Sequence, residues 1–255
     1  LRFRDLNLVK KELQFFLDQK VPQVKFVDRT FNCHHTHAKE IWRYLLEHDN
    51  GVTNFHFEVS ADLLDEEELE LISRMRSGLI QLEIGVQSTN PDTIRKIRRT
   101  MNFKRLSEVT KQIKTMGNTH QHLDLIAGLP EDTPEGFRRT LDKCLSYGAD
   151  NITVHTLSLK KGSRILLENF TIPSAEAVGE MLDYANAALR QADFRPYYLY
   201  RQKYMSGSFE NTGWCISGAE GLYNIYIMEE LHSILSLGAG GSTKMVDPVH
   251  QRIER

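Results

Sequence analysis

Cysteine is scarce in this sequence of 255 residues, in which only Cys33, Cys144 and Cys215 occur. They are odd in number and far apart, which argues against a framework of disulfides and against a zinc or iron–sulfur site built from neighbouring cysteines. This usage is typical of a protein in a reducing compartment. We therefore expect the cytoplasm as its location.

Long apolar runs and an excess of one charge are missing as well. No apolar stretch approaches the roughly 18 residues that a membrane-spanning helix needs. The 32 basic and 34 acidic side chains leave a net charge of −2, so no overall field draws the chain onto nucleic acid or an anionic membrane. We expect a globular protein with neither of these partners. Because the chain opens on Leu1 rather than Met, we also expect a fragment of a longer protein.

The sequence does contain a regular alternation of short β-branched or aromatic runs with longer amphipathic ones. The short runs, which predict strands, span 23–28, 54–59, 79–85, 122–128 and 151–157. The amphipathic runs, which predict helices, include 6–19, 35–48, 65–77 and 103–117, and further helices start at Asn90–Pro91 and Thr133–Pro134. Parallel strands joined by right-handed helical crossovers fit this order. The pattern predicts an α/β barrel or open sheet that lacks a strand before its first helix.

The pattern changes after about residue 160. A helical run over 173–192 is followed by an aromatic, glycine-containing stretch over 195–215, which predicts loop or irregular β structure. A second helical run spans 228–238 and ends in the glycine-rich stretch 238–242. We therefore place a boundary near residue 165, with the α/β domain over 1–165 and a small α+β extension over 166–255.

Polar side chains stand at the carboxyl ends of all five predicted strands, where chemistry gathers in parallel α/β sheets. They are Asp28, Glu58, Gln87, Asp124 and His155. Any one of them could simply cap the next helix. Glu58 and Asp124 lie in otherwise apolar runs and need hydrogen-bond partners, which a ribose or an α-amino group would supply. Glu83, two residues before Gly85, is interpreted as structural.

Two charged clusters allow more than one interpretation. The basic run 95–99 is either a solvated helix face or the source of one arginine turned back over the strand ends to bind a ligand carboxylate, a bidentate task that suits arginine. The histidines His34, His35 and His37 are dense, but neighbours at a helix start point in different directions and no carboxylate is spaced to complete a site. We therefore predict no metal site in this chain.

Two motifs resemble a known family. The sequence LEIGVQSTNPDTIRKIRR (82–99) followed by HLDLIAGLPEDTPEGF (122–137) is similar to radical S-adenosylmethionine enzymes, with the oxygen-independent coproporphyrinogen oxidases as nearest kin. The resemblance implies a partial (β/α)6 TIM-like barrel whose first strand leads into a CxxxCxxC loop. The chain would start just after that loop, so that residues 1–165 hold strands two to six and residues 166–255 form a substrate-side extension.

The two halves of the chain resemble different branches of the family. The segment from VKFVDRTFNC (24–33) to the GVQS region resembles radical enzymes with a B12-binding domain. From about residue 135, and clearly in NITVHTLSLKKGSR (151–164), the chain resembles the coproporphyrinogen dehydrogenase branch. Cobalamin would therefore be a cofactor only in the first of these readings.

The resemblance also implies roles for individual residues. S-adenosylmethionine would be bound by polar contacts and by apolar flanks on its adenine, from Glu58, Ile84, Gln87, Arg99, Asp124 and Ile126. Glu58 would meet the methionine or ribose part, Arg99 the carboxylate, and Gln87 and Asp124 the ribose. A 4Fe–4S cluster belongs to the full-length family, but its cysteine ligands are absent here.

The extension mixes aromatic faces with cations at Arg195, Tyr198 and Arg201, which suits a flat tetrapyrrole that carries carboxylates. An ordinary amphipathic edge strand is the alternative. The resemblance implies a fragment of a radical oxidoreductase of the coproporphyrinogen III dehydrogenase type, which decarboxylates porphyrinogen propionates oxidatively in haem biosynthesis. Flavodoxin or ferredoxin would donate electrons. The alternatives are a B12-dependent radical enzyme of unknown substrate and a cluster-less, non-catalytic binding module.

Overall fold

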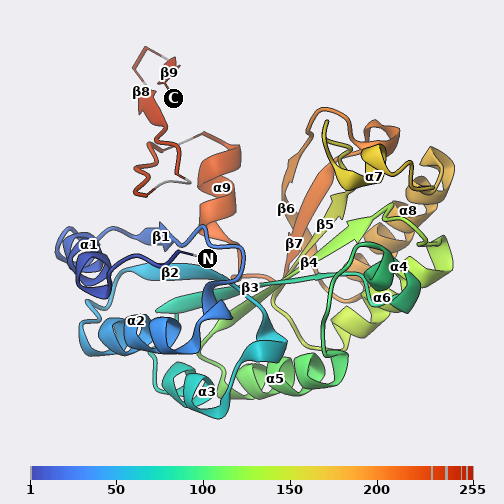
Figure 1. Ribbon diagram of the computed structural model, residues 1–255. Helices are drawn as coiled ribbons and strands as arrows, with labels where there is room; N and C mark the ends of the chain where they lie inside the picture. Colours follow the sequence, from blue (N-terminus) through green and yellow to red (C-terminus); the bar gives the residue numbers. More distant parts are fainter. Residues whose placement is uncertain (1, 231, 239–240, 248, 251, 255) are drawn as a thin grey trace.

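A curled, seven-stranded sheet forms the centre of the computed structural model, which describes residues 2–230, 232–238, 241–247, 249–250 and 252–254. The sheet order is β1-β2-β3-β4-β5-β7-β6 (Figure 1). The first five strands are β1 (Gln23–Lys25), β2 (Asn54–Val59), β3 (Ile80–Gln87), β4 (His120–Ala127) and β5 (Asn151–Thr156). They are parallel neighbours in chain order, which confirms the predicted half-barrel.

Helices cover the outer face of this sheet, as Figure 1 shows. They are α1 (Leu6–Asp18), α2 (His35–Glu47), α3 (Glu66–Ser73), α4 (Pro91–Lys96), α5 (Phe103–Met116) and α6 (Pro134–Leu145), with short 3₁₀ turns at Phe31–Cys33 and Ala61–Leu63. The sequence signals for their ends are confirmed. Asn90 and Thr133 cap α4 and α6 with a proline at the first helical turn, and Gly117 ends α5 with a φ of +71°.

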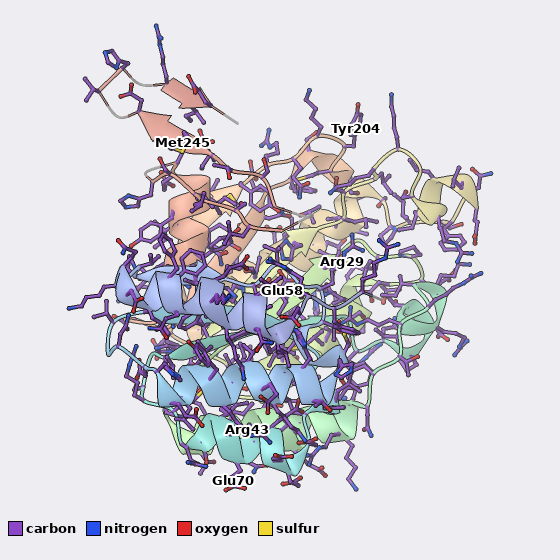
Figure 2. All side chains as sticks on the ribbon, turned by 60° about the vertical axis from the view of Figure 1, so that its left-hand side comes forward. Arg29, Arg43, Glu58, Glu70, Tyr204 and Met245 are labelled. Carbon is purple, nitrogen blue, oxygen red and sulfur yellow. The ribbon has the colours of Figure 1, made fainter. Side chains whose placement is uncertain are left out.

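The hydrophobic core lies between the sheet and these helices. Alternate side chains of the strands, such as Phe57 and Leu82, are fully buried there against Trp42 of α2. The ring of Phe57 packs edge-on to Trp42, at 5.9 Å between centroids. Each such side chain contributes roughly 1.5–3 kcal/mol by leaving water. The solvent side of the helices is charged, and Figure 2 labels Arg43 and Glu70 on this outer layer.

The stretch over 195–215 forms two strands joined by a loop, and their pairing is irregular between Pro196 and Tyr198, so its prediction as loop or irregular β structure is confirmed in part. After α7 (Arg164–Leu167) and α8 (Ala175–Gln191) come the strand β6 (Arg195–Tyr200), a short turn at Ser206–Ser208 and the strand β7 (Asn211–Cys215). Strand β7 runs antiparallel to both β5 and β6 and thereby extends the main sheet. Gly213 makes this pairing possible, because a Cβ there would overlap the Tyr198 ring.

The prediction of a helix over 228–238 is wrong. The helix α9 lies earlier, at Leu222–Met228, residues 229–230 and 232–238 are not helical, and residue 231 lies outside the described residues. Tertiary contacts override local propensity here, since Ile234 instead pairs with Lys244 in an antiparallel bridge. The strands β8 (Met245–Asp247) and β9 (Arg252–Glu254) pair antiparallel beyond it, away from the sheet (Figure 1).

Candidate functional site

The inner face of the sheet carries a row of polar side chains. Successive residues of a strand point to opposite faces, so the residues that alternate with the buried core positions face the hollow of the half-barrel. From β1 to β6 they are Lys25, His56, Glu58, Glu83, His122, Asp124, Thr153, His155 and Tyr198. Only Glu58, Asp124, His155 and Tyr198 were candidates from the sequence.

Lys25 is the cation at the first end of this row. Its Nζ lies 3.1 Å from Glu58 Oε1 and 2.5 Å from Glu83 Oε2. Burial alone would lower the pKa of Lys25, but the two carboxylates raise it above its usual value. Burial raises the pKa of Glu58 despite this partner. The group therefore holds one ammonium between two carboxylates of unequal acidity.

His56 lies beside Glu83 without being charged. Its Nε2 is 2.7 Å from Glu83 Oε2. Burial lowers the pKa of His56 to about 4, so the ring is neutral near pH 7. Burial and the charge of Asp124 would raise the pKa of Glu83, but His56 and Lys25 hold it below its usual value. Glu83, interpreted from the sequence as structural, thus shares both a face and a cation with Glu58.

Asp124 is the centre of a second polar group. Its Oδ1 lies 3.2 Å from His155 Nε2 and 3.4 Å from His122 Nε2. Burial would raise the pKa of Asp124, but the two imidazoles hold it well below its usual range. Burial would likewise lower the pKa of His155, but the hydrogen bond and the charge of Asp124 raise it. The pair is an imidazolium–carboxylate pair at mildly acidic pH.

A hydrogen-bonded chain continues from this pair to the extension of the sheet. His122 Nε2 lies 2.6 Å from Thr153 Oγ1, and Thr153 Oγ1 lies 2.9 Å from the hydroxyl of Tyr198. Burial raises the pKa of Tyr198, so its hydroxyl stays protonated. The substrate candidate Tyr198 therefore belongs to the inner-face network, whereas Arg195 is exposed and Arg201 is exposed and paired with Glu210.

At the carboxyl end of β3, the side chains of Gln87 and Arg99 converge on the backbone of Gly85, a group that we call the Gly85 cradle. The register shifts between Gly85 and Gln87, and Gln87 has a φ of +66°. Bulges and positive φ values at non-glycine residues cluster at functional sites. A Cβ on Gly85 would lie 2.5 Å from Gln87 Nε2 and 3.4 Å from an Arg99 nitrogen, so the glycine makes room for both side chains.

Arg99 turns back over this strand end instead of facing solvent. Its guanidinium donates to the carbonyl oxygen of Gly85, and its Nε is buried without a partner. Burial lowers the pKa of Arg99, against the opposing charges of Asp62 and Asp124, but an arginine stays charged. Of the two interpretations of the basic run, this geometry matches the arginine that is turned back.

The two isoleucines occupy different faces. Ile126 pairs in register with His155 and shares the inner face with Asp124. Ile84 is fully buried in the core between sheet and helices, so the structure does not bring it to this site. Asp28, beyond the end of β1, is exposed.

The inner face is covered at one end and accessible at the other. At the amino end, the Tyr223 ring of α9 lies 5.1 Å from Lys25 Nζ, and Asn224 donates to the Tyr197 hydroxyl at 3.1 Å. The side chain of Lys25 is accordingly 8% exposed, against 34% for Glu58 and 29% for His155 nearer the carboxyl edge. A ligand would therefore reach this network from the carboxyl edge.

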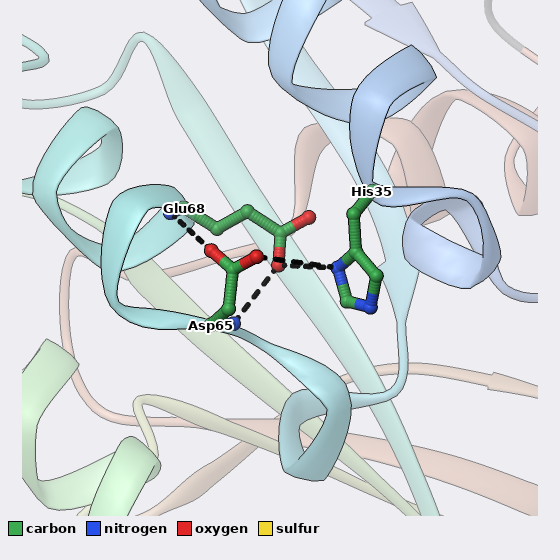
Figure 3. Close-up of side chains that lie close together, drawn as sticks. All are labelled: His35, Asp65 and Glu68. Carbon is green, nitrogen blue, oxygen red and sulfur yellow. Dashed lines mark hydrogen bonds and ion pairs between the residues drawn. The ribbon is translucent and has the colours of Figure 1, made fainter.

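A group of metal-binding residue types lies outside the hollow, where Figure 3 shows His35, Asp65 and Glu68 together. Asp65 and Glu68 form a reciprocal capping box at the start of α3, and His35 Nδ1 lies 3.0 Å from Glu68 Oε2. Lys39 Nζ already lies 2.6 Å from Asp65 Oδ2. Helix capping and this lysine account for the arrangement.

The three cysteines do not fit an iron–sulfur cluster. Cys33 is exposed after a 3₁₀ turn, Cys144 is buried in α6, and Cys215 is buried in β7. Burial raises the pKa of Cys144 to about 12 and that of Cys215 to about 11, which opposes the thiolate form that a cluster needs. A cavity of about 240 Å³ lies elsewhere, between α8 and the strands β5 and β7.

Residues 1–144 match the model of the Radical SAM superfamily, and the chain belongs to this family. It is 32% identical over 188 residues to the oxygen-independent coproporphyrinogen-III oxidase-like protein HemZ of Bacillus subtilis, covering 73% of this chain and 37% of that protein. It is 23% identical over 159 residues to the heme chaperone HemW of Buchnera aphidicola, covering 62% of this chain and 42% of HemW.

Among solved structures, the coproporphyrinogen III oxidase HemN of Escherichia coli shares the fold. The TM-score is 0.63 at 18% identity, over 92% of this chain and 54% of HemN. The chain thus spans about a third to a half of the length of these proteins. None of the helices that the structure describes is long and apolar enough to cross a membrane.

Proposed function

We propose that this chain is the cofactor-binding part of a radical S-adenosylmethionine oxidoreductase of the coproporphyrinogen oxidase type. One observation carries the proposal. Arg99 and Gln87 converge on the Gly85 cradle at the same sheet edge that presents Asp124, although the sequence separates Gln87 from Asp124 by a helical crossover. Family membership supports the choice of cofactor.

The residues at this edge fit S-adenosylmethionine. The orphaned Nε of Arg99 is a donor for the carboxylate of the cofactor. Asp124 Oδ2, to which no described residue donates a hydrogen bond, is an acceptor for a ribose hydroxyl. Glu58 would meet the amino or ribose part and Ile126 the adenine. When bound and reduced, this cofactor supplies hydrogen-atom abstraction. The chain's own residues bind and orient it, and no step here rests on an iron–sulfur cluster.

A porphyrinogen that carries propionates is the substrate class we propose, with oxidative decarboxylation in haem biosynthesis as the reaction. The names of HemZ and HemN support it. In the division that we propose, residues 1–165 form the barrel, and residues 166–255 form a substrate-side extension that contributes Tyr198. A flavodoxin or ferredoxin would supply electrons in a cytoplasmic protein. The relative named as a heme chaperone favours haem binding without oxidation as the second candidate.

Binding of S-adenosylhomocysteine to the chain, measured by titration calorimetry, tests the cofactor site. Replacing Arg99 with Met removes a charged hydrogen bond, typically about 1.5–3 kcal/mol, so we expect affinity to fall about tenfold or more. Arg95→Met is the matched control, because Arg95 lies on the preceding α4 turn, is 76% exposed and pairs with Asp92. Equal affinities of the two variants would contradict the site.

A further inference from the structure

The carboxylate of Asp124 is held asymmetrically. Both imidazoles, of His122 and His155, approach Oδ1 most closely, whereas no hydrogen bond reaches Oδ2 from any residue that the structure describes. Asp124 is 13% exposed, so Oδ2 is accessible only from the hollow. A carboxylate anchored through one oxygen offers the other at a fixed position.

The two imidazoles differ in what else they hold. His122 is 1% exposed, lies at the longer distance of 3.4 Å, and is also 2.6 Å from Thr153 Oγ1. His155 is 29% exposed at the accessible edge, and Asp124, at 3.2 Å, is the only partner of its ring among the described residues. His155 is therefore the imidazole whose contact with Asp124 would directly affect a ligand bound at this edge.

We propose that His155 is a positioning residue that fixes Asp124 through Nε2, so that Oδ2 accepts a ribose hydroxyl of an adenosyl ligand. The inference rests on the proposed function, because it assumes that this edge binds such a ligand. It goes further, because it assigns the fixed orientation of the Asp124 carboxylate to a residue of the neighbouring strand β5. His155 itself does not touch the ribose.

Protonation of His155 gives this device a pH dependence. The charged groups that act on the ring are Asp124 from β4 and Glu83 from β3. The pKa of His155 is raised, since Asp124 outweighs the effect of burial, so the ion pair is complete below that pKa and is lost as the pH rises through it. Ligand affinity should fall over the same pH interval, because the neutral imidazole can carry its one proton on Nδ1, and Nε2 then no longer donates to Asp124.

Two substitutions separate position from charge. In His155→Gln, the amide nitrogen takes the place of Nε2 and keeps a neutral hydrogen bond to Asp124. In His155→Asn, the shorter side chain leaves Asp124 without it. His120→Gln is the control, because His120 stands on the same strand as Asp124 but at its amino end, 45% exposed and near Asp150.

The experiment measures S-adenosylhomocysteine affinity of the four proteins across the neutral pH range, together with the His155 imidazole titration by NMR in the ligand-free chain. We expect His155→Asn to bind about threefold to tenfold more weakly, the size of one net hydrogen bond. His155→Gln should bind about as well as the native chain at neutral pH but without the fall in affinity at higher pH. A pH dependence that comes from the ligand itself would also be present in His155→Gln, so the difference between the two pH profiles isolates the contribution of His155.

The outcomes are distinguishable. Binding that is equal in the native chain and in His155→Asn overturns the inference and leaves the proposed function standing, and so does a His155 ring that titrates below the usual value for histidine. If the native chain binds no S-adenosylhomocysteine at all, the adenosyl site is wrong and the inference falls with it. Weakening by His120→Gln as large as that by His155→Asn would also refute it, because the effect would then not be specific to Asp124.

Discussion

Replacing Lys25 with Met tests the charge balance on which the inner face depends. Lys25 is 8% exposed and lies within 3.1 Å of both Glu58 and Glu83. Met has a similar length, so the change removes charge without opening a large cavity. It leaves Glu83, 17% exposed, without its cation. Breaking a buried ion pair from one side destabilises a protein by about 3–5 kcal/mol, which is the loss we expect.

Urea denaturation followed by circular dichroism measures this loss. With an m-value of about 3 kcal/mol/M, the urea concentration at the midpoint of unfolding should fall by about 1–2 M. Lys11→Met, at an exposed position of α1, should stay within about 0.5 kcal/mol of the native chain. The double variant Lys25→Met with Glu83→Gln should be less destabilised than the sum of the two single variants. A loss below about 1 kcal/mol in Lys25→Met would refute the reasoning.

The pH dependence of the same variant has a definite sign. Without the ammonium, the folded-state pKa of Glu83 rises above its unfolded value, and a carboxyl group raised in this way destabilises the fold only while it is ionised. The penalty of Lys25→Met should therefore be largest at neutral pH and shrink as the pH falls through that raised pKa. A penalty that grows on acidification would show that Lys25 does not compensate these carboxylates.

Two further predictions concern the extension and the metal. Gly213→Ala should lower stability by about 1–3 kcal/mol, a fall in Tm of several degrees in a thermal melt, because its Cβ overlaps the rigid Tyr198 ring; an unchanged Tm would contradict the packing of β6 on β7. Anaerobic reconstitution of this chain with iron and sulfide should give no stoichiometric cluster absorption, because Cys33, Cys144 and Cys215 stand on separate elements; a stable, oxygen-sensitive cluster would contradict that.

Local signals in the sequence were sufficient for the parallel half of the fold. Runs such as 54–59 and 122–128 are short, rich in apolar residues and without an exposed position, as strands of a covered parallel sheet are. The caps at Asn90 and Thr133 fix where helices begin. The crossover rule then fixes the hand of the connections, and the resemblance to a partial-barrel family favours strands in chain order. Each of these signals acts over a few residues, so a single sequence carries them.

The extension could not be predicted in the same way, because its structure depends on distant partners. β7 is a strand because β5 offers it an open edge, and Tyr198 can lie across it only because residue 213 is a glycine. Similarly, α9 forms where Tyr223 and Asn224 meet the barrel, and not where the local pattern is most helical. Aromatic and glycine content alone does not reveal such pairings.

Part of the candidate site could be predicted from the strand ends in the sequence, whereas the rest depends on the register between neighbouring strands. Counting to the carboxyl end of each strand points to Glu58, Gln87 and Asp124 as candidates, since that edge is shared by all parallel strands. The inner layer was missed, because Lys25 lies three residues before Asp28 and His56 two residues before Glu58, and both matter only through Glu83 on another strand. Alternation within each strand was the available signal.

The structure of this chain bound to S-adenosylhomocysteine, determined by crystallography or by NMR shift mapping, tests the central claim most directly. The account predicts the ligand at the carboxyl edge, with its ribose on Asp124 Oδ2, its carboxylate on Arg99, and the largest backbone shifts at Gly85 and Gln87. A ligand found instead in the cavity of about 240 Å³ between α8 and β7, or shifts that spare the Gly85 cradle, would contradict it.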